Sequence, residues 1–299
     1  MTIKKISYVA SIAFTSIIAS QAAYATEGGG SNYPMGAEGS LVGALPPPGF
    51  YTLFYAERYS ANALKDNNGN TVPVNFGITA DVLAPRFVWV TGNTFLGGQV
   101  AHAILIPLVN LNVNLNGTGQ TKSGIGDIDI TAVVLGYHHT ANLHSALGLD
   151  FLLPTGAYDK NALTNIGRNY TTIEPVYAVS YINPAGWNMD VKMMYDFNLK
   201  NNATDYTSGQ EFHVDYALGY GVANNWVVGV GGYAYKQITT DRQYGVEVPN
   251  NKGQAFAIGP SIKYDTGKGF FMTAKYQQEM DVQNRPQGKA FWVKAILPF

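Results

Sequence analysis

Apolar and polar residues alternate along most of this chain with the two-residue period of a β-strand. The pattern is clearest in the last stretch, where one row holds Phe291, Val293, Ala295, Leu297 and Phe299. No polar residue follows that aromatic residue in the sequence. An apolar strand of this kind needs an apolar surface outside it. Lipid is the simplest such surface, and the core of a soluble all-β domain is the alternative.

The alternating pattern divides the chain from residue 49 onward into twelve runs. They cover 50–59, 79–91, 95–108, 126–137, 142–153, 171–182, 187–199, 210–222, 226–238, 253–264, 270–280 and 288–299. Long polar connections (60–78, 109–125, 154–170, 200–209, 239–252 and 281–287) alternate with short turns (92–94, 138–141, 183–186, 223–225 and 265–269). This alternation is typical of outer-membrane proteins. It predicts an all-β fold, an antiparallel transmembrane β-barrel of about twelve strands with periplasmic termini and long extracellular loops.

Several runs separate into one face of aromatic and aliphatic residues and another face of charged residues. A soluble barrel would bury the apolar face, so the pattern alone does not decide between water and lipid outside. The aromatic residues decide, because rings favour the headgroup region of a membrane. A membrane girdle is therefore predicted at Trp187, Trp226, Phe270 and Phe299, beside the short turns and the end of the last run.

The charged face would then line the lumen. Its candidate residues are Asp129, Asp150, Glu174, Lys192, Asp196, Glu211, His213, Asp215, Lys263 and Lys275. Charges of both signs in a confined space normally pair, so one interpretation is an ion-pair network that makes the barrel rigid. The other interpretation is a permeation path for a solute. At the long-loop mouth, Arg168, Asn169, Tyr170 and Tyr206 are candidate ligand contacts, although ordinary hydrated loops have the same composition.

The N-terminal region has no strand period. A basic start, an apolar stretch and Ala23-Tyr-Ala25 predict a signal peptide over residues 1–25. Residues 26–48 are rich in Gly, Pro and Ser, so they should be irregular. This segment can either hang in the periplasm or fold back into the lumen as a plug. The apolar stretch is too short for a membrane helix, and no run of about 18 apolar residues occurs later.

The amino-acid composition narrows the classes of function that are possible. Charged residues make up only 13% of the chain, against about a quarter in soluble domains. Loss of Lys4 and Lys5 with the signal peptide leaves 17 basic against 20 acidic residues, which excludes a basic nucleic-acid surface. The absence of cysteine excludes disulfides and thiol catalysis.

Catalytic motifs are also missing from the sequence. An outer-membrane phospholipase would need a Ser and a His brought together at the lipid boundary. His144 and Ser145 point to opposite faces of one strand, so they cannot form that pair. His138 and His139 have no acidic or Cys partner at ligand spacing. We therefore expect no enzyme, no cofactor and no metal site.

Several short motifs extend through most of the chain in order. They are Pro46-Pro-Pro-Gly-Phe-Tyr51, Gly97-Gly98, Gly124-Ile-Gly-Asp-Ile128, Leu153-Pro-Thr-Gly-Ala-Tyr-Asp159, Asn165-Ile-Gly-Arg-Asn-Tyr170, Tyr206-Thr-Ser-Gly-Gln-Glu211, Lys236-Gln-Ile-Thr-Thr-Asp241, Ile258-Gly-Pro260 and Phe299. With these motifs the chain resembles the outer-membrane transporter-like family linked to the meta pathway of phenol degradation, also called SphA-like proteins. The resemblance implies an outer-membrane barrel that passes hydrophobic or aromatic compounds, but it does not supply a set of binding residues.

The expected function is passive uptake of small hydrophobic compounds, aromatic ones among them, across the outer membrane of a Gram-negative cell. The expected partners are membrane lipids, the solute, and the insertion machinery that reads the C-terminal strand, whose pattern is similar to the known sorting signal. The alternative is a structural or adhesion barrel with a closed lumen. A continuous apolar path would favour transport, and paired charges around Lys192, Asp196 and Glu211 would favour the closed barrel.

Overall fold

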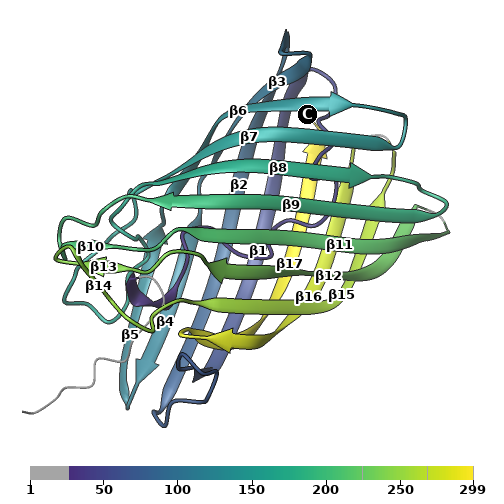
Figure 1. Cartoon of the computed structure of the whole chain (residues 1–299). Helices are drawn as coiled ribbons and strands as arrows, with labels where there is room; N and C mark the ends of the chain where they lie inside the picture. The colour runs from purple at the N-terminus through teal and green to yellow at the C-terminus, as the bar shows by residue number, and fades with distance from the viewer. Residues whose placement is uncertain (1–26, 224, 268, 299) are drawn as a thin grey trace, which may run out of the picture.

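The structure, a computed structural model, describes residues 27–223, 225–267 and 269–298. Twelve antiparallel strands form a closed barrel (Figure 1). In order around the barrel they are β1 (Gly49–Leu64), β2 (Phe76–Phe95), β3 (Gly98–Leu105), β6 (Ile128–His138), β7 (Leu143–Leu153), β8 (Thr172–Tyr181), β9 (Trp187–Asn198), β11 (Glu211–Ala223), β12 (Trp226–Gln237), β15 (Gln254–Asp265), β16 (Phe271–Gln283) and β17 (Pro286–Pro298). β1 pairs with β2 on one side and with β17 on the other, so the sheet closes on itself. The predicted all-β barrel of twelve strands is confirmed.

The two rims of the barrel differ. Turns that join β2 to β3, β6 to β7, β8 to β9, β11 to β12 and β15 to β16 make a short-turn rim, and most of the longer connections make a long-loop rim. Tyr51 near the start of β1 pairs with Pro298 at the end of β17. The barrel therefore begins and ends at the short-turn rim. The predicted signal peptide, residues 1–25, lies outside the described residues.

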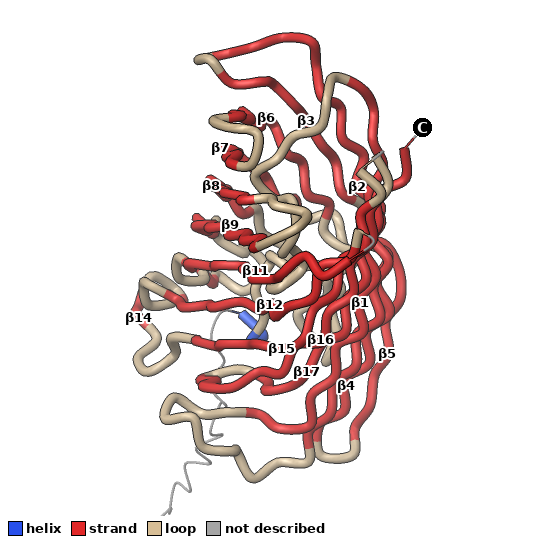
Figure 2. The backbone as a smooth tube through the Cα atoms, turned by 90° about the vertical axis from the view of Figure 1, so that its right-hand side faces the viewer, coloured by secondary structure: helices blue, strands red, loops and turns tan. Residues whose placement is uncertain are grey.

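The predicted long loop 109–125 is wrong, because this stretch forms a hairpin of β4 (Leu108–Leu115) and β5 (Thr118–Ile125). β2 pairs with β3 through its second half and with β4 through its first half, so the hairpin extends the wall at the long-loop rim on the side of β2 away from β1 (Figure 2). Its turn is Asn116-Gly117, with φ of 51° and 86°. Asn-Gly is the residue pair that two-residue hairpin turns favour. The hairpin turn could therefore have been predicted from the sequence, although the Asn and Thr residues of this stretch suggested a loop.

Two connections are also shorter than the sequence suggested. β2 continues to Phe95, so the turn lies at Leu96 and Gly97 instead of 92–94. Only Asn284 and Arg285 separate β16 from β17, so 281–287 is not a long loop. The remaining loops carry a small sheet of β10 (Tyr206–Thr207), β13 (Arg242–Gln243) and β14 (Val246–Glu247). A short helix, η1 (Glu27–Gly29), begins the described chain.

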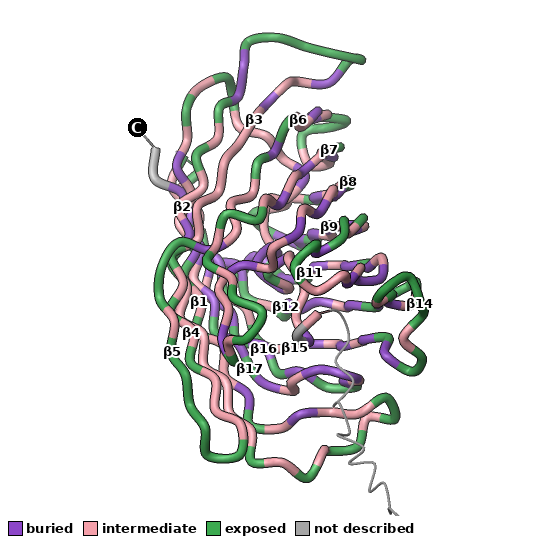
Figure 3. The backbone as a smooth tube through the Cα atoms, turned by 90° about the vertical axis from the view of Figure 1, so that its left-hand side faces the viewer, coloured by how far each residue is buried: buried purple, intermediate pink, exposed green. Residues whose placement is uncertain are grey.

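The barrel is the reverse of a soluble one, because its charged face is inside. On β9, Trp187 and Met189 are 56% and 50% exposed, whereas Asp190 and Lys192 are 5% and 7% exposed. Buried and exposed residues alternate in this way along the strands (Figure 3). An apolar outer belt of this extent is unfavourable in water and favourable in lipid. The exposed apolar face and the buried charged face thus indicate that lipid surrounds the barrel, whereas the alternating pattern alone was compatible with either lipid or water outside.

The predicted girdle residues are found on this outer surface only in part. Trp187 and Trp226 are 56% and 38% exposed beside the short-turn rim, and Phe270 is half-buried there. Phe299 lies outside the described residues. No helix among the described residues is long and apolar enough to cross a membrane.

Candidate functional site in the barrel interior

Residues 27–48 make hydrogen bonds with inward-facing side chains of the wall and with the loops above it. At the long-loop rim, the Glu27 carboxylate accepts from Tyr158 and Asn201. Towards the other rim, the backbone N–H of Gly43 donates to Ser180 Oγ over 2.9 Å. A side chain at Gly43 would collide with the backbone of β8, since a Cβ there would lie 2.8 Å from the Ser180 nitrogen. The segment therefore contacts the interior along much of its height.

Asp215 on β11 fixes the middle of this segment. Its carboxylate accepts from the Tyr33 hydroxyl (2.7 Å) and from the backbone N–H groups of Gly36 (2.9 Å) and Glu38 (3.0 Å). A carboxylate that accepts several N–H and O–H donors is a strong hydrogen-bond partner. Gly36 has φ of 80°, a left-handed conformation that glycine adopts without strain. This one wall residue therefore holds three positions of the segment, Tyr33, Gly36 and Glu38.

Glu38 is the segment's own charged contact with the wall. One carboxylate oxygen lies 2.6 Å from Lys294 Nζ, and the other lies 3.3 Å from Arg86 Nη1 and accepts from the Tyr55 hydroxyl over 2.9 Å. The Lys275 ammonium donates to the backbone carbonyl of Glu38. The carboxylate is 7% exposed. The buried Lys294 and the half-buried Arg86, from opposite parts of the sequence, thus share one anion from the segment.

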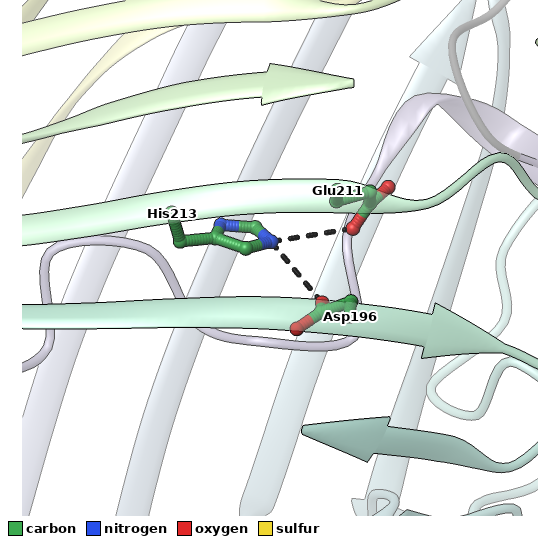
Figure 4. A group of neighbouring side chains, drawn as sticks. All are labelled: Asp196, Glu211 and His213. Carbon is green, nitrogen blue, oxygen red and sulfur yellow. Dashed lines mark hydrogen bonds and ion pairs between the residues drawn. The ribbon is translucent and has the colours of Figure 1, made fainter. Parts of the chain in front are cut away.

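A row of buried carboxylates crosses four neighbouring strands. In the strand register, Asp150 on β7 lies opposite Glu174 on β8, and Asp196 on β9 lies opposite Glu211 on β11. His213 lies between the last two, with Nε2 at 3.1 Å from Asp196 and 3.3 Å from Glu211 (Figure 4). All five side chains are at most 2% exposed. Acidic charge is therefore concentrated on this part of the interior.

An open pocket of about 450 Å³ lies against β1, β2, β4 and β5. Its lining is Glu57, Asp81, Val82, Leu83, Leu108, Val109, Asn110, Ser123, Gly124 and Ile125. Val82 and Val109 pair with each other on the inner face, whereas Leu83, Leu108 and Ile125 alternate with the inner row and are 46%, 46% and 50% exposed. Glu38 of the segment contacts Tyr55 on β1 and Arg86 on β2, two of the strands that line this pocket. The pocket thus combines aliphatic and polar groups, and none of its lining residues belongs to residues 27–48.

The sequence candidates for the lumen lie on the inner face of the barrel. Asp150, Glu174, Lys192, Asp196, Glu211, His213, Asp215, Lys263 and Lys275 are buried, and Asp129 is half-buried. Within the described ranges, Lys192 forms no ion pair with Asp196 or Glu211. Its ammonium lies 4.8 Å from the centre of the Tyr33 ring instead. The ion-pair network considered from the sequence is thus replaced at this point by contacts with the segment.

The four mouth candidates join loops to one another and to the N-terminal segment. Arg168 donates from its guanidinium to the Ser31 carbonyl, and Asn169 donates to Asn201. Tyr170 and Tyr206 are 3% and 9% exposed. Burial and the neighbouring Asp241 carboxylate raise the pKa of the Tyr206 hydroxyl, so it stays protonated and donates to that carboxylate.

Asp241 holds this loop cluster together, and its removal should open it. The buried carboxylate accepts from the Tyr206 hydroxyl, the Gly209 N–H and the amides of Gln237 and Asn251. Asp241→Ala removes the acceptor of the Tyr206 hydroxyl and the Gly209 N–H, while the Gln237 and Asn251 amides keep the Thr239 carbonyl and the Tyr206 hydroxyl as acceptors, and we expect a loss of about 2 to 3 kcal/mol in the free energy of local opening. The rate of tryptic cleavage in these loops, measured on the intact barrel, checks this.

The matched control is Glu247→Gln in the same loop, whose carboxylate side chain is 65% exposed. It should leave the cleavage rate close to that of the wild type. Equal rates for the two variants would show that Asp241 does not order the loops.

Sequence reasoning missed the residues that join the segment to the wall, above all Ser31, Tyr33, Glu38 and Arg86. One signal was available for Glu38, which is the single charged residue between 28 and 56. An acid in an otherwise uncharged stretch suggests a cation partner elsewhere. Its partners could not be found without the barrel, because they lie 48 and 256 positions away.

Histidines at the short-turn rim make one contact that the sequence did not predict. His144 and Ser145 do not form a pair, as expected, but His139 Nε2 lies 2.7 Å from Ser145 Oγ. His138 Nδ1 and His144 Nδ1 are also 2.7 Å apart. Among the described residues no carboxylate contacts either of these pairs. The arrangement therefore lacks the acid that usually orients a catalytic histidine.

The outward apolar belt, the buried charged interior and the closed sheet define the class of the protein, a twelve-stranded β-barrel of the outer-membrane type. The chain belongs to the family described as "Putative MetA-pathway of phenol degradation", whose model matches residues 61–295. The family resemblance noted in the motifs is thus confirmed. No curated protein matches the chain.

Solved structures share the fold at low sequence identity. The COG4313 outer membrane channel from Pseudomonas putida F1 is 16% identical, with a TM-score of 0.75 over 86% of this chain and 97% of that one. The translocator domain of the autotransporter NalP from Neisseria meningitidis is 10% identical, with a TM-score of 0.50 over 86% of this chain and 91% of that one. At these identities the likeness concerns the fold.

Proposed function

We propose that this protein is an outer-membrane channel for the passive uptake of small hydrophobic compounds, aromatic ones among them. The short-turn rim, where β1 begins and β17 ends, faces the periplasm, and the long-loop rim, where Glu27 contacts the loops, faces the outside. Residues 27–48 act as a plug that keeps ions and hydrophilic molecules from crossing. The C-terminal strand β17 presents the apolar row that the barrel-insertion machinery reads. The family assignment and the channel described for the P. putida barrel support this proposal.

The observation that carries the proposal is the open pocket of about 450 Å³ against β1, β2, β4 and β5. An apolar cavity of roughly 150 Å³ is enough to hold benzene. Val82 and Val109 supply apolar side chains to this pocket, which has room for a compound the size of phenol or toluene. Binding in such an open space is weak, which suits a channel that must release its solute.

The second candidate is a structural or adhesion barrel with a closed lumen. The observation that favours it is the number of contacts from residues 27–48, which reach Asp215, Ser180 and Lys294 on three different strands. A segment held this firmly would close the lumen to every solute. The two candidates differ in whether any hydrophobic compound crosses.

Uptake into proteoliposomes tests the proposal. Vesicles that hold the refolded barrel should take up labelled phenol and toluene faster than protein-free vesicles, and a hydrophilic compound of equal size should not enter faster. Val82→Trp puts a large side chain into the pocket and should slow uptake several-fold. Phe87→Trp on the same strand is the matched control, because Phe87 is 47% exposed on the outer face.

Uptake that is the same for Val82→Trp and Phe87→Trp would remove the pocket from the path. If the wild-type barrel admits no compound faster than bare lipid does, the closed structural barrel becomes the better account.

A further inference from the structure

Four polar atoms from three parts of the chain meet at one point of the interior. His213 Nε2 lies 3.1 Å from Asp196 Oδ2 and 3.3 Å from Glu211 Oε2. Ser31 Oγ, on the N-terminal segment, lies 3.3 Å from the same nitrogen and 2.7 Å from Glu211 Oε2. Figure 4 shows the imidazole pointing between the two carboxylates, which come from neighbouring strands. Ligand bonds of roughly 2.1 Å place neighbouring ligand atoms about 3 to 3.4 Å apart, and the distances from His213 Nε2 to Asp196 Oδ2, Glu211 Oε2 and Ser31 Oγ fall in this range.

The charges in this cluster do not balance. Asp196, Glu211 and His213 are each 0% exposed. Within the part of the chain that the structure describes, neither carboxylate forms an ion pair with a Lys or Arg. A neutral imidazole leaves two buried negative charges, and an imidazolium ion leaves one. Buried charge without a counter-ion costs several kcal/mol.

A second observation also indicates that a positive charge is missing from this cluster. Glu174 on β8 lies between Ile173 and Val176, which pair with Phe197 and Met194, so it stands opposite Asp196. Glu174 is 1% exposed. Its Oε2 and the Asp196 Oδ1 are both buried without a hydrogen-bond partner. Carboxylate oxygens in this state normally bind a cation or a donor.

We propose that Asp196, Glu211 and His213 bind a divalent cation of the Zn²⁺ class. Two carboxylates balance its charge, and an imidazole nitrogen favours Zn²⁺ over Ca²⁺ or Mg²⁺, which prefer oxygen ligands. His213 binds through Nε2 and keeps its ring proton on Nδ1, so a proton leaves the imidazolium form when the cation enters. Ser31 Oγ is close enough to complete the ligand set.

The site has a structural consequence. Asp196 belongs to β9 and Glu211 and His213 to β11, whereas Ser31 belongs to the segment within the barrel. A bound cation therefore joins two wall strands to residues 27–48. This consequence is independent of which solute the barrel transports.

Zinc binding to the refolded full-length mature chain tests the proposal. The chain is freed of metal with a chelator, equilibrated with Zn²⁺ and assayed for bound metal and affinity. The background is His138→Asn with His144→Asn, which removes the exposed histidine pair at the short-turn rim. We expect one equivalent of Zn²⁺ in this background. Asp196→Asn and Glu211→Gln should each weaken binding by at least about 100-fold.

X-ray absorption of the zinc-loaded background gives a readout that does not depend on the folding of the cluster variants. A spectrum with one imidazole and several oxygen ligands supports the proposal. No bound zinc, a spectrum with two or more imidazoles, or folded cluster variants that bind as tightly as the background would overturn it. Migration of the unheated barrel on a denaturing gel shows which variants are folded.

Discussion

Deletion of residues 27–48 is expected to raise the ion conductance of the barrel several-fold. In the wild-type protein these residues contact the wall from the long-loop rim, through Glu27, to β8 near the other rim, through Gly43. The inner face that remains is lined by charged and polar side chains. Such a surface is wetted by water and admits ions once the segment is gone.

Single-channel recording in planar bilayers measures this effect. The matched control keeps the segment in place by a covalent bond, which is convenient because the chain has no cysteine of its own. Asn32→Cys with Thr172→Cys, joined by a short thiol crosslinker, uses two side chains whose polar atoms are 2.6 Å apart. The crosslinked barrel should conduct like the wild type. A deletion variant that also conducts like the wild type would show that residues 27–48 do not block the lumen.

Glu38→Gln is expected to lower the free energy of unfolding by about 3 to 5 kcal/mol, the usual cost of removing one partner from a buried ion pair. The carboxylate lies 2.6 Å from Lys294 Nζ and 3.3 Å from Arg86 Nη1. Lys294 and Arg86 side chains are 7% and 16% exposed, so water replaces the lost anion poorly. The neutral amide keeps one accepting oxygen and places an NH₂ donor where the other oxygen accepted, so the loss combines the charge with one hydrogen-bond acceptor.

Urea unfolding in detergent, followed by the heat-sensitive migration of the folded barrel, measures this loss. Asp205→Asn is the matched control, because Asp205 and Lys200 form an ion pair whose side chains are 44% and 47% exposed. An exposed pair contributes at most about 1 kcal/mol. Adding Lys294→Met to Glu38→Gln should recover part of the loss, since it removes a cation that lacks a counter-ion. Equal losses for Glu38→Gln and Asp205→Asn would mean that water reaches Lys294.

The two results bear on the transport proposal in different ways. A conductance that rises on deletion places the barrier to ions within residues 27–48. A large loss for Glu38→Gln shows that the segment is fixed to the wall as well as lying against it. Together they would require hydrophobic solutes to pass beside the segment, where Val82 and Val109 line the pocket.

Much of the fold could be predicted from the sequence because strand pairing in a barrel repeats one local rule. Each of the twelve runs carries a two-residue period. Residues such as Asp190 and Trp187 on β9 can therefore be assigned to opposite faces of their strand without knowledge of any partner strand. The β4–β5 hairpin was not predicted, because the outward-facing residues of β4 are the polar Asn110, Asn112 and Asn114. A strand that lies outside the membrane needs no apolar side chains at such positions.

The sequence by itself thus determined the strand order, the inner and outer faces and the family. Only the tertiary structure decided what fills the interior. Glu38 meets Lys294 and Arg86, and Ser31 meets Glu211 and His213, across gaps of up to 256 positions. The physical reason is that faces follow from local periodicity, whereas these contacts depend on how an irregular segment, without any period to read, crosses a closed barrel.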